Sequence, residues 1–209
     1  MNPALFRRAA LAALAAVVFL SPQLHGQTRP DALVLYRQGS YEQAVEVTLQ
    51  ELRDNPSNLD SYVVLGWSLL ELRRFSQALE YAQQALRVSR FDHRVLHIIS
   101  EAHYGLGNHL QALQFLQEYA TIAPQGRYIA QVYYLMGEVF LRFEEYNHAD
   151  MALTKAVHHL ATPANWWMRL GFAREMAGSI PLARAAYEQA LQRNPNLLDA
   201  RRALDRLQG

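Results

Sequence analysis

The sequence has no cysteine, only one lysine and almost no net charge. Without a thiol, the chain has no disulfide, no lipid-modified cysteine, no thiolate nucleophile and no thiolate metal site. The 20 basic residues face 19 acidic ones, and the formal charge of the 209 residues is +1 at pH 7. Such a balance gives no positive field that could hold a phosphate backbone, so we expect no nucleic-acid partner.

No apolar run is long enough to span a bilayer comfortably. The longest, residues 9–20, follows two arginines and is ended by Ser21 and Pro22. As a helix it would measure about 18 Å, against about 30 Å for the hydrocarbon core. The pattern is typical of a signal peptide, so we expect residues 1–26 to be removed and the protein to be periplasmic or secreted. The alternatives are a buried N-terminal helix or an uncleaved anchor, which would then be the chain's membrane contact.

Small residues recur through the rest of the chain with a period near 34. Five equivalent alanines are separated by 34, 34, 37 and 34 residues: Ala44, Ala78, Ala112, Ala149 and Ala183. A second small residue precedes each of them, with large apolar residues three and four positions apart beside it. This spacing predicts two amphipathic helices per unit. Because a unit of this size cannot bury both faces alone, we expect neighbouring units to stack and share a core.

These residues resemble the tetratricopeptide repeat family, whose period and W-x2-L-G-x2-Y…A…P pattern they follow. The best match is in the last unit: Trp167, Leu170, Gly171, Gly178, Ala183, Tyr187 and Pro195. The resemblance covers about residues 28–209 and implies an all-α fold, a right-handed superhelical solenoid. It implies about five helix-turn-helix units and a capping helix, at about 28–58, 59–92, 93–126, 130–163, 164–197 and 198–209.

Departures from the repeat pattern predict local features. The first unit lacks its large apolar pair, so its first helix should be short and begin near Asp31. Three extra residues, 127–129, should bend or rotate the stack between the third and fourth units. His103 and Arg174 replace an aromatic residue and need partners if buried. Left-handed helix ends are expected at Gly39, Gly107 and Gly178, whereas Arg73 and Glu144 replace glycine at the equivalent positions of two units.

In the family that the chain resembles, the first helix of each unit lines a concave surface. Helical spacing nominates these residues for a partner-binding groove: Tyr36, Val63, Trp67, Leu70, His97, Glu101, Tyr104, Tyr134, Glu138, Leu141, Met168 and Phe172. Aromatic and methionine side chains offer large contact areas with few rotatable bonds, which suits a partner helix or an extended peptide. Three alternatives stay open: these residues bury one another, the face holds a small apolar ligand, or the protein regulates an enzyme subunit.

The sequence offers weak candidates for chemistry. His93, His97 and Glu101 are four residues apart, a spacing that can chelate a metal, but no HExxH pattern is present and we expect packed or solvated histidines. Glu101 and Glu138 are acids of one groove, and a hydrolytic pair would need further polar residues. Because phosphate-loop and nucleophile-elbow motifs are also absent, we expect a non-enzymatic scaffold without cofactor or metal, bound to an envelope or secreted protein.

Overall fold

The computed structural model describes residues 30–207, which form eleven helices and no strand. In chain order the helices are α1 (Ala32–Arg37), α2 (Tyr41–Asp54), α3 (Leu59–Glu71), α4 (Phe75–Val88), α5 (His93–Gly105), α6 (His109–Ile122), α7 (Ile129–Arg142), α8 (Tyr146–His159), α9 (Ala164–Met176), α10 (Ile180–Arg193) and α11 (Leu198–Arg206).

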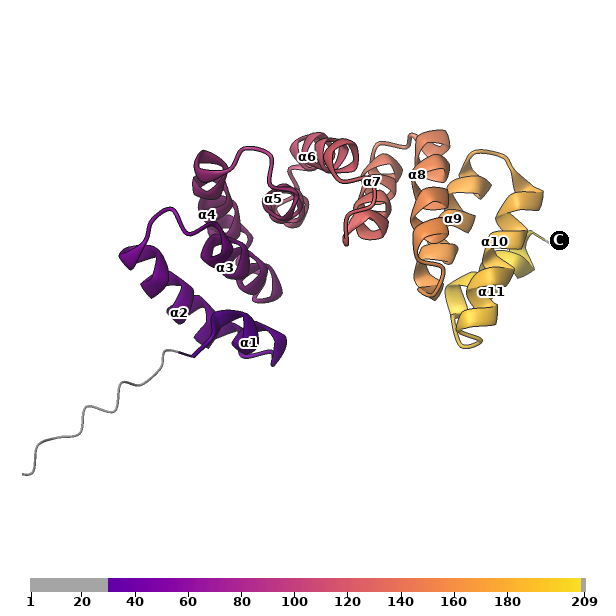
Figure 1. Cartoon of the computed structure of the whole chain (residues 1–209). Coiled ribbons are helices and arrows are strands. Elements are labelled where there is room, and N and C mark those ends of the chain that lie inside the picture. The colour runs from indigo at the N-terminus through magenta and orange to yellow at the C-terminus, as the bar shows by residue number, and fades with distance from the viewer. Residues whose placement is uncertain (1–29, 208–209) are drawn as a thin grey trace, which may run out of the picture.

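The helices follow one another along the molecule as five pairs and a final single helix (Figure 1). The predicted all-α stack of five helix pairs with a capping helix is therefore confirmed. The expected export segment, residues 1–26, lies outside the described residues. None of the described helices is long and apolar enough to cross a bilayer.

Small residues allow the helices to approach closely. The five equivalent alanines are all 0% exposed: Ala44, Ala78, Ala112, Ala149 and Ala183. A Cβ atom at Gly137 would lie 2.5 Å from Cγ of Leu153, and one at Gly171 would lie 2.6 Å from the ring of Tyr187. In both cases the glycine of a first helix faces a large side chain of the second helix of its pair. The spacing of small residues therefore sets how closely these helices pack.

The hydrophobic clusters cross the boundaries between pairs. One cluster joins α2 to α5, the next joins α5 to α7, a third joins α7 to α10, and the last joins α10 to α11. Each cluster therefore draws side chains from more than one pair. Stability depends on the contacts between neighbours as much as on any single pair, as the period predicts.

Five loop residues adopt the left-handed conformation: the three glycines for which the sequence predicts it, and the two residues that replace glycine in the other units. Their φ angles are +79° at Gly39, +78° at Gly107, +78° at Gly178, +58° at Arg73 and +59° at Glu144. A side chain in this conformation costs roughly 1–2 kcal/mol, so the tight turn between paired helices is kept at two positions without glycine.

The two end helices have distinct boundaries. As predicted, α1 is short and begins after Asp31, whose carboxylate accepts hydrogen bonds from two amides of the first turn (2.8 and 3.1 Å). In α11, Ala200 and Leu204 are buried against α10. Leu198 is instead 58% exposed. Two residues correspond to about 200° of helical rotation, so Leu198 lies opposite Ala200.

The two polar residues that replace aromatic ones find partners. Nε of Arg174 donates to Oδ1 of Asp150 (2.9 Å), and its Nη2 donates to the hydroxyl of Thr154 (3.1 Å). The ring of His103 stacks against Phe115, with the centroids 5.7 Å apart. The histidine contact joins the two helices of one pair, whereas the arginine contacts join α9 to α8 of the preceding pair.

The three extra residues lengthen the connection between α6 and α7. The amide of Tyr128 donates to the hydroxyl of Tyr119 (3.1 Å), and the amide of Ile129 donates to the carbonyl of Gly126 (3.0 Å). In Figure 1, α5 and α6 are seen nearly end-on whereas α8 is seen from its side, so the helix direction changes across this connection.

We predict that Gly171→Ala lowers the free energy of unfolding by about 1 kcal/mol or more, because the added methyl group overlaps the buried ring of Tyr187. Intrinsic helix propensity alone would favour alanine by about 1 kcal/mol. Urea denaturation measures the change. Glu188→Ala, on the exposed side of α10, is the control and should change little. Equal or greater stability of Gly171→Ala would show that the helices are not closely packed here.

Candidate functional site

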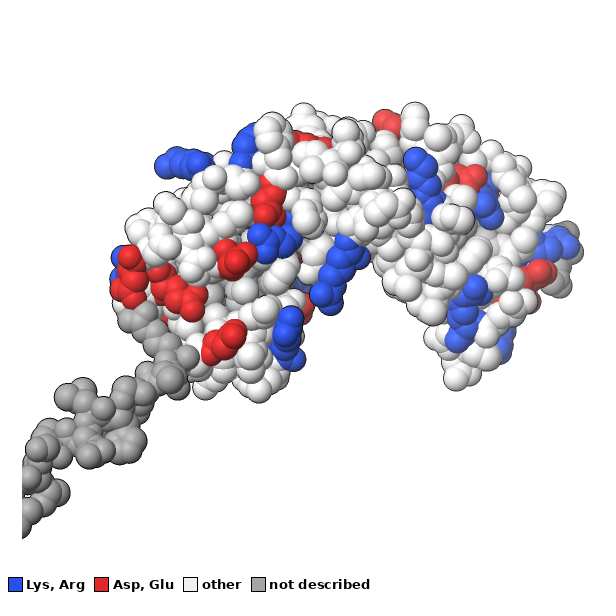
Figure 2. Space-filling view, in the orientation of Figure 1, with Lys and Arg blue, Asp and Glu red and all other residues white. Residues whose placement is uncertain are grey.

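The first helices of successive pairs line the inside of the arch. Contacts beyond sequence neighbours join α1 to α3, α3 to α5 and α7 to α9. Helices on the inside of a curve lie closest together, so these elements form the concave face; the space-filling view shows the arched outline (Figure 2). The helices α5 and α7 come less close than the other neighbouring first helices. The connection with three extra residues lies at this place.

A ladder of polar contacts links the inner helices. In each rung, one side chain donates to a carboxylate about one repeat earlier: Arg94 to Asp60 (2.8 Å), Gln131 to Glu101, Arg169 to Glu138 (2.5 and 2.9 Å) and Arg206 to Glu175 (2.8 Å). Three of these rungs are ion pairs. The rung between α5 and α7 uses a neutral amide.

Glu101 therefore lacks the arginine that pairs with the other acids of the ladder. Its side chain is 21% exposed. Among the described residues, no Arg or Lys is within ion-pair distance of it. Burial raises the pKa of Glu101 to about 7, and the nearby carboxylate of Glu71 raises it further in the same direction. Glu101 is thus a carboxyl whose charge is poorly compensated by the protein.

His97 lies one helical turn before Glu101 and is 3% exposed. Its Nε2 is 3.5 Å from Oε1 of Glu101, and neither ring nitrogen has a hydrogen-bond partner. Burial lowers the pKa of His97 to about 3, and the neighbouring His93 lowers it as well, so the ring is neutral at pH 7. Within residues 30–207, His, Asp and Glu side chains do not come together in threes as a metal site.

Aromatic rings form a row across the inner face. The ring of Trp67 is 5.7 Å from that of Tyr36 and 6.2 Å from that of Tyr128. Tyr128 in turn stacks on His97, with centroids 4.0 Å apart and an interplanar angle of 16°. Burial and the nearby Glu71 raise the pKa of Tyr36 to about 12. The row links the first three pairs to the start of α7.

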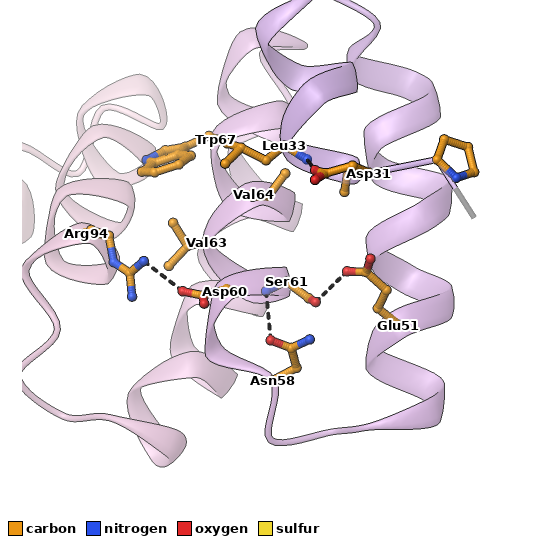
Figure 3. A pocket seen from close by; sticks show the side chains of 12 residues that line it. Asp31, Leu33, Glu51, Asn58, Asp60, Ser61, Val63, Val64, Trp67 and Arg94 are labelled. Atoms are coloured by element: carbon orange, nitrogen blue, oxygen red, sulfur yellow. Dashed lines mark hydrogen bonds and ion pairs between the residues drawn. The ribbon is translucent and has the colours of Figure 1, made fainter. Parts of the chain in front are cut away.

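Two cavities flank this row. The first has a volume of about 560 Å³ and is bordered by Trp67, Val63 and the Arg94–Asp60 ion pair (Figure 3). Its opposite wall comes from the start of α1 and from α2. The second has a volume of about 490 Å³ and combines the acids Glu71 and Glu101 and the base Arg73 with four apolar or aromatic side chains: Leu70, Phe75, Tyr104 and Leu135.

The C-terminal part of the concave face, from α7 to α11, has its own aromatic contacts and its own cavity. Tyr134 stacks on Trp166 with centroids 4.7 Å apart. Burial raises the pKa of Tyr134 to about 12, and Glu138 adds to this effect. The guanidinium of Arg169 lies 5.6 Å from the ring centroid of Phe172. Met168 and Phe172 border a cavity of about 320 Å³ that ends at α11.

The structure thus divides the predicted groove into three stretches. The first contains Tyr36, Val63, Trp67 and His97, the second Leu70, Glu101 and Tyr104, and the third Tyr134, Glu138, Met168 and Phe172. One correction concerns the side chains expected to offer contact surface. Val63, His97 and Leu141 are only 1%, 3% and 8% exposed, because neighbouring inner helices pack over them. The nine others are partly accessible.

Sequence reasoning missed Tyr128, Gln131 and the ladder arginines. Tyr128 precedes α7 and lies outside the helical register used to choose groove residues. Its position among the three extra residues was the available signal. The ladder partners lie 34, 30, 31 and 31 residues apart, at the repeat period or a few residues short of it, so a comparison of polar residues 30 to 34 positions apart would have indicated them.

The sequence matches the tetratricopeptide repeat family model over residues 31–87 and 63–127. A TPR repeat-containing protein of Methanocaldococcus jannaschii is 24% identical over 161 residues, which make up 76% of this chain and 28% of that protein. The chain therefore spans less than a third of that relative.

Solved structures with the same fold have low sequence identity to the chain. The crystal structure of MamA has a TM-score of 0.68 at 18% identity, covering 78% of this chain and 94% of MamA. That of YrrB, described as a TPR protein with an unusual peptide-binding site, has a TM-score of 0.70 at 14% identity, covering 78% and 82%. These similarities support the fold.

The pKa of Glu101 predicts a specific pH dependence of stability. The pKa of Glu101 is higher in the folded protein, about 7, than in the unfolded chain, 4.5. Its contribution to the free energy of unfolding is therefore fully present below pH 4.5 and is lost as the pH rises through about 7. His97 acts oppositely, because its stabilising contribution is present above pH 6.5 and is lost as the pH falls through about 3. Between pH 4.5 and 6.5 the two slopes oppose each other.

We therefore expect Glu101→Gln to gain stability relative to the unmodified protein as the pH rises from 4.5 to 7. Urea denaturation across this range measures the difference at each pH. Glu188→Gln, on the exposed side of α10, serves as the matched control. A difference between Glu101→Gln and the unmodified protein that stays constant with pH would contradict the raised pKa.

Proposed function

The chain belongs to the tetratricopeptide repeat family, and on this premise we propose that it is a non-enzymatic scaffold that holds a segment of a partner protein on its concave face. The observation that carries the proposal is the row of Tyr36, Trp67 and Tyr128, with one open cavity bordered by Trp67 and a second bordered by Leu70 and Glu101, about one helical turn after Trp67 and His97. Partly exposed aromatic rings beside cavities are typical anchoring points for a peptide.

The dimensions of the face favour a peptide over a small apolar ligand. The cavity with the most apolar lining is bordered by Tyr133, Met136, Phe140 and Met151 and has a volume of about 170 Å³. Small-molecule sites usually exceed about 300 Å³. The two larger cavities are open and carry Asp31, Glu71 and Glu101, which suit the mixed polar and apolar surface of a polypeptide. YrrB, with the same fold, is described as having a peptide-binding site.

We propose that the scaffold acts in the cell envelope or outside the cell. The support is the N-terminal segment, in which two arginines precede the apolar residues 9–20. The absence of cysteine is compatible with an oxidising compartment, since no thiol is available for unwanted disulfides.

Photo-crosslinking in the native cell tests the binding face. A photoreactive amino acid replacing Tyr104, beside the second cavity, should capture a partner protein, whereas one replacing Leu110, on the exposed side of α6, should not. Adding Trp67→Ala should reduce capture about 30-fold, the effect expected for a loss of about 2 kcal/mol at an interface anchor. Equal capture from both positions, or capture unaffected by Trp67→Ala, would reject the concave face as the binding site.

The export proposal has a separate test. We expect the protein recovered from the periplasm or the medium to begin at Gln27, because cleavage is predicted after Gly26. N-terminal sequencing or intact-mass measurement gives the answer. A membrane-bound protein that retains residues 1–26 would instead indicate an anchor, and recovery from the cytoplasm alone would reject export.

A further inference from the structure

Tyr128 fills the place where the inner helices separate. It comes from the three extra residues before α7, and its ring lies where α5 and α7 fail to approach closely. The ring stacks on His97 at 4.0 Å and lies 6.2 Å from the ring of Trp67. Its backbone is held through the hydroxyl of Tyr119. The ring therefore leaves by rotation about its own side-chain bonds, without movement of the helices.

Buried polar atoms beside this ring have no partner. They are Nδ1 and Nε2 of His97 and Nε1 of Trp67. Buried polar atoms in proteins are usually hydrogen-bonded, and each one left unpaired costs about 1–3 kcal/mol. Tyr128 stacks on the ring of His97 and gives none of these three nitrogens a hydrogen bond. A polypeptide in its place would bring amide and carbonyl groups that can pair with these nitrogens.

Glu101 has no cation paired with it among the described residues, although Arg73 borders the same cavity and Arg127 lies 6.0 Å from the ring centroid of Tyr128. Arginine completes the ladder at Asp60, Glu138 and Glu175, whereas Glu101 receives only the amide of Gln131. Glu101 borders the cavity of about 490 Å³ together with Glu71. An arginine or lysine side chain from outside would supply the missing charge in a partly buried setting, where ion pairs with good geometry contribute most.

We propose, on the basis of the proposed function, that the gap between α5 and α7 anchors a partner segment in which an aromatic residue lies next to a basic one. The aromatic ring takes the place of Tyr128 between Trp67 and His97, and the basic side chain pairs with Glu101. In the unbound protein Tyr128 acts as an internal substitute for the partner's ring. Tyr128 must be displaced before the partner binds, and the free energy of this displacement lowers the apparent affinity of the protein for the partner.

Peptide titration with matched variants tests this assignment. The probes are three fluorescein-labelled hexapeptides: Gly-Ser-Tyr-Arg-Ser-Gly, a version with Ala for Tyr, and a version with Gln for Arg. Fluorescence polarisation measures their affinity for the unmodified protein and for Tyr128→Ala, with and without Glu101→Gln. Phe91→Ala, which removes a ring that is 67% exposed outside the groove, is the control. Circular dichroism establishes that each variant is folded.

We expect Tyr128→Ala to bind the Tyr-Arg peptide at least 10-fold more tightly than the unmodified protein does, and to bind the Ala-Arg peptide no more tightly. In Tyr128→Ala, the Arg peptide should bind at least 5-fold better than the Gln peptide, and Glu101→Gln should remove this preference. Phe91→Ala should behave as the unmodified protein.

Several results would overturn the assignment. One is a Tyr128→Ala variant that melts at a lower temperature but gains no affinity, because Tyr128 would then serve packing alone. Another is an equal gain for the Tyr and Ala peptides, or an Arg preference that survives Glu101→Gln. Self-association of Tyr128→Ala without peptide would assign the gap to a second copy of the chain. The photo-crosslinking experiment keeps the two proposals apart. If position 104 captures a partner while any of these results is found, only the assignment of Tyr128 is overturned and the proposed function stands. If position 104 captures no partner, the proposed function is rejected.

Discussion

The close approach of helices at small residues determines the rest of this structure. Alanines at 0% exposure and glycines such as Gly171, which faces the ring of Tyr187, let paired helices meet with little space between them. Each pair then leaves an apolar side for its neighbour, and the hydrophobic clusters run from one pair into the next. Because burial is shared in this way, the first helices lie on the inside of an arch. Polar residues on the concave side of these helices then form the ladder.

The proposed binding face depends on one interruption of this regularity. Where the period lengthens from 34 to 37 residues, α5 and α7 separate and the ladder loses its arginine. Tyr128 enters the space, Glu101 is paired with a neutral amide instead of an arginine, and the ring nitrogens of the buried His97 have no hydrogen-bond partner. Burial then moves the pKa of Glu101 up and that of His97 down, so both groups favour the neutral form. A scaffold built for stacking thereby acquires a place where an additional chain would improve the packing and the charge balance.

The sequence predicts the repeated parts of the structure well and the interruption poorly. Ala44 and its equivalents, the short α1 after Asp31, and the left-handed turns at Gly39, Gly107 and Gly178 all follow from local rules that apply within one unit. The groove residues required side-chain directions as well. Val63, His97 and Leu141 lie in register with exposed residues but are covered by adjacent helices. Tyr128 could not be placed from periodicity, because its position depends on how a connection without helical register folds back over α3 and α5.

A structure of the protein with its crosslinked partner would test the central claim most directly. The account predicts an aromatic side chain of the partner between Trp67 and His97, a basic side chain at Glu101, and the ring of Tyr128 turned away. A partner bound to the second helices, with Tyr128 still stacked on His97, would contradict it.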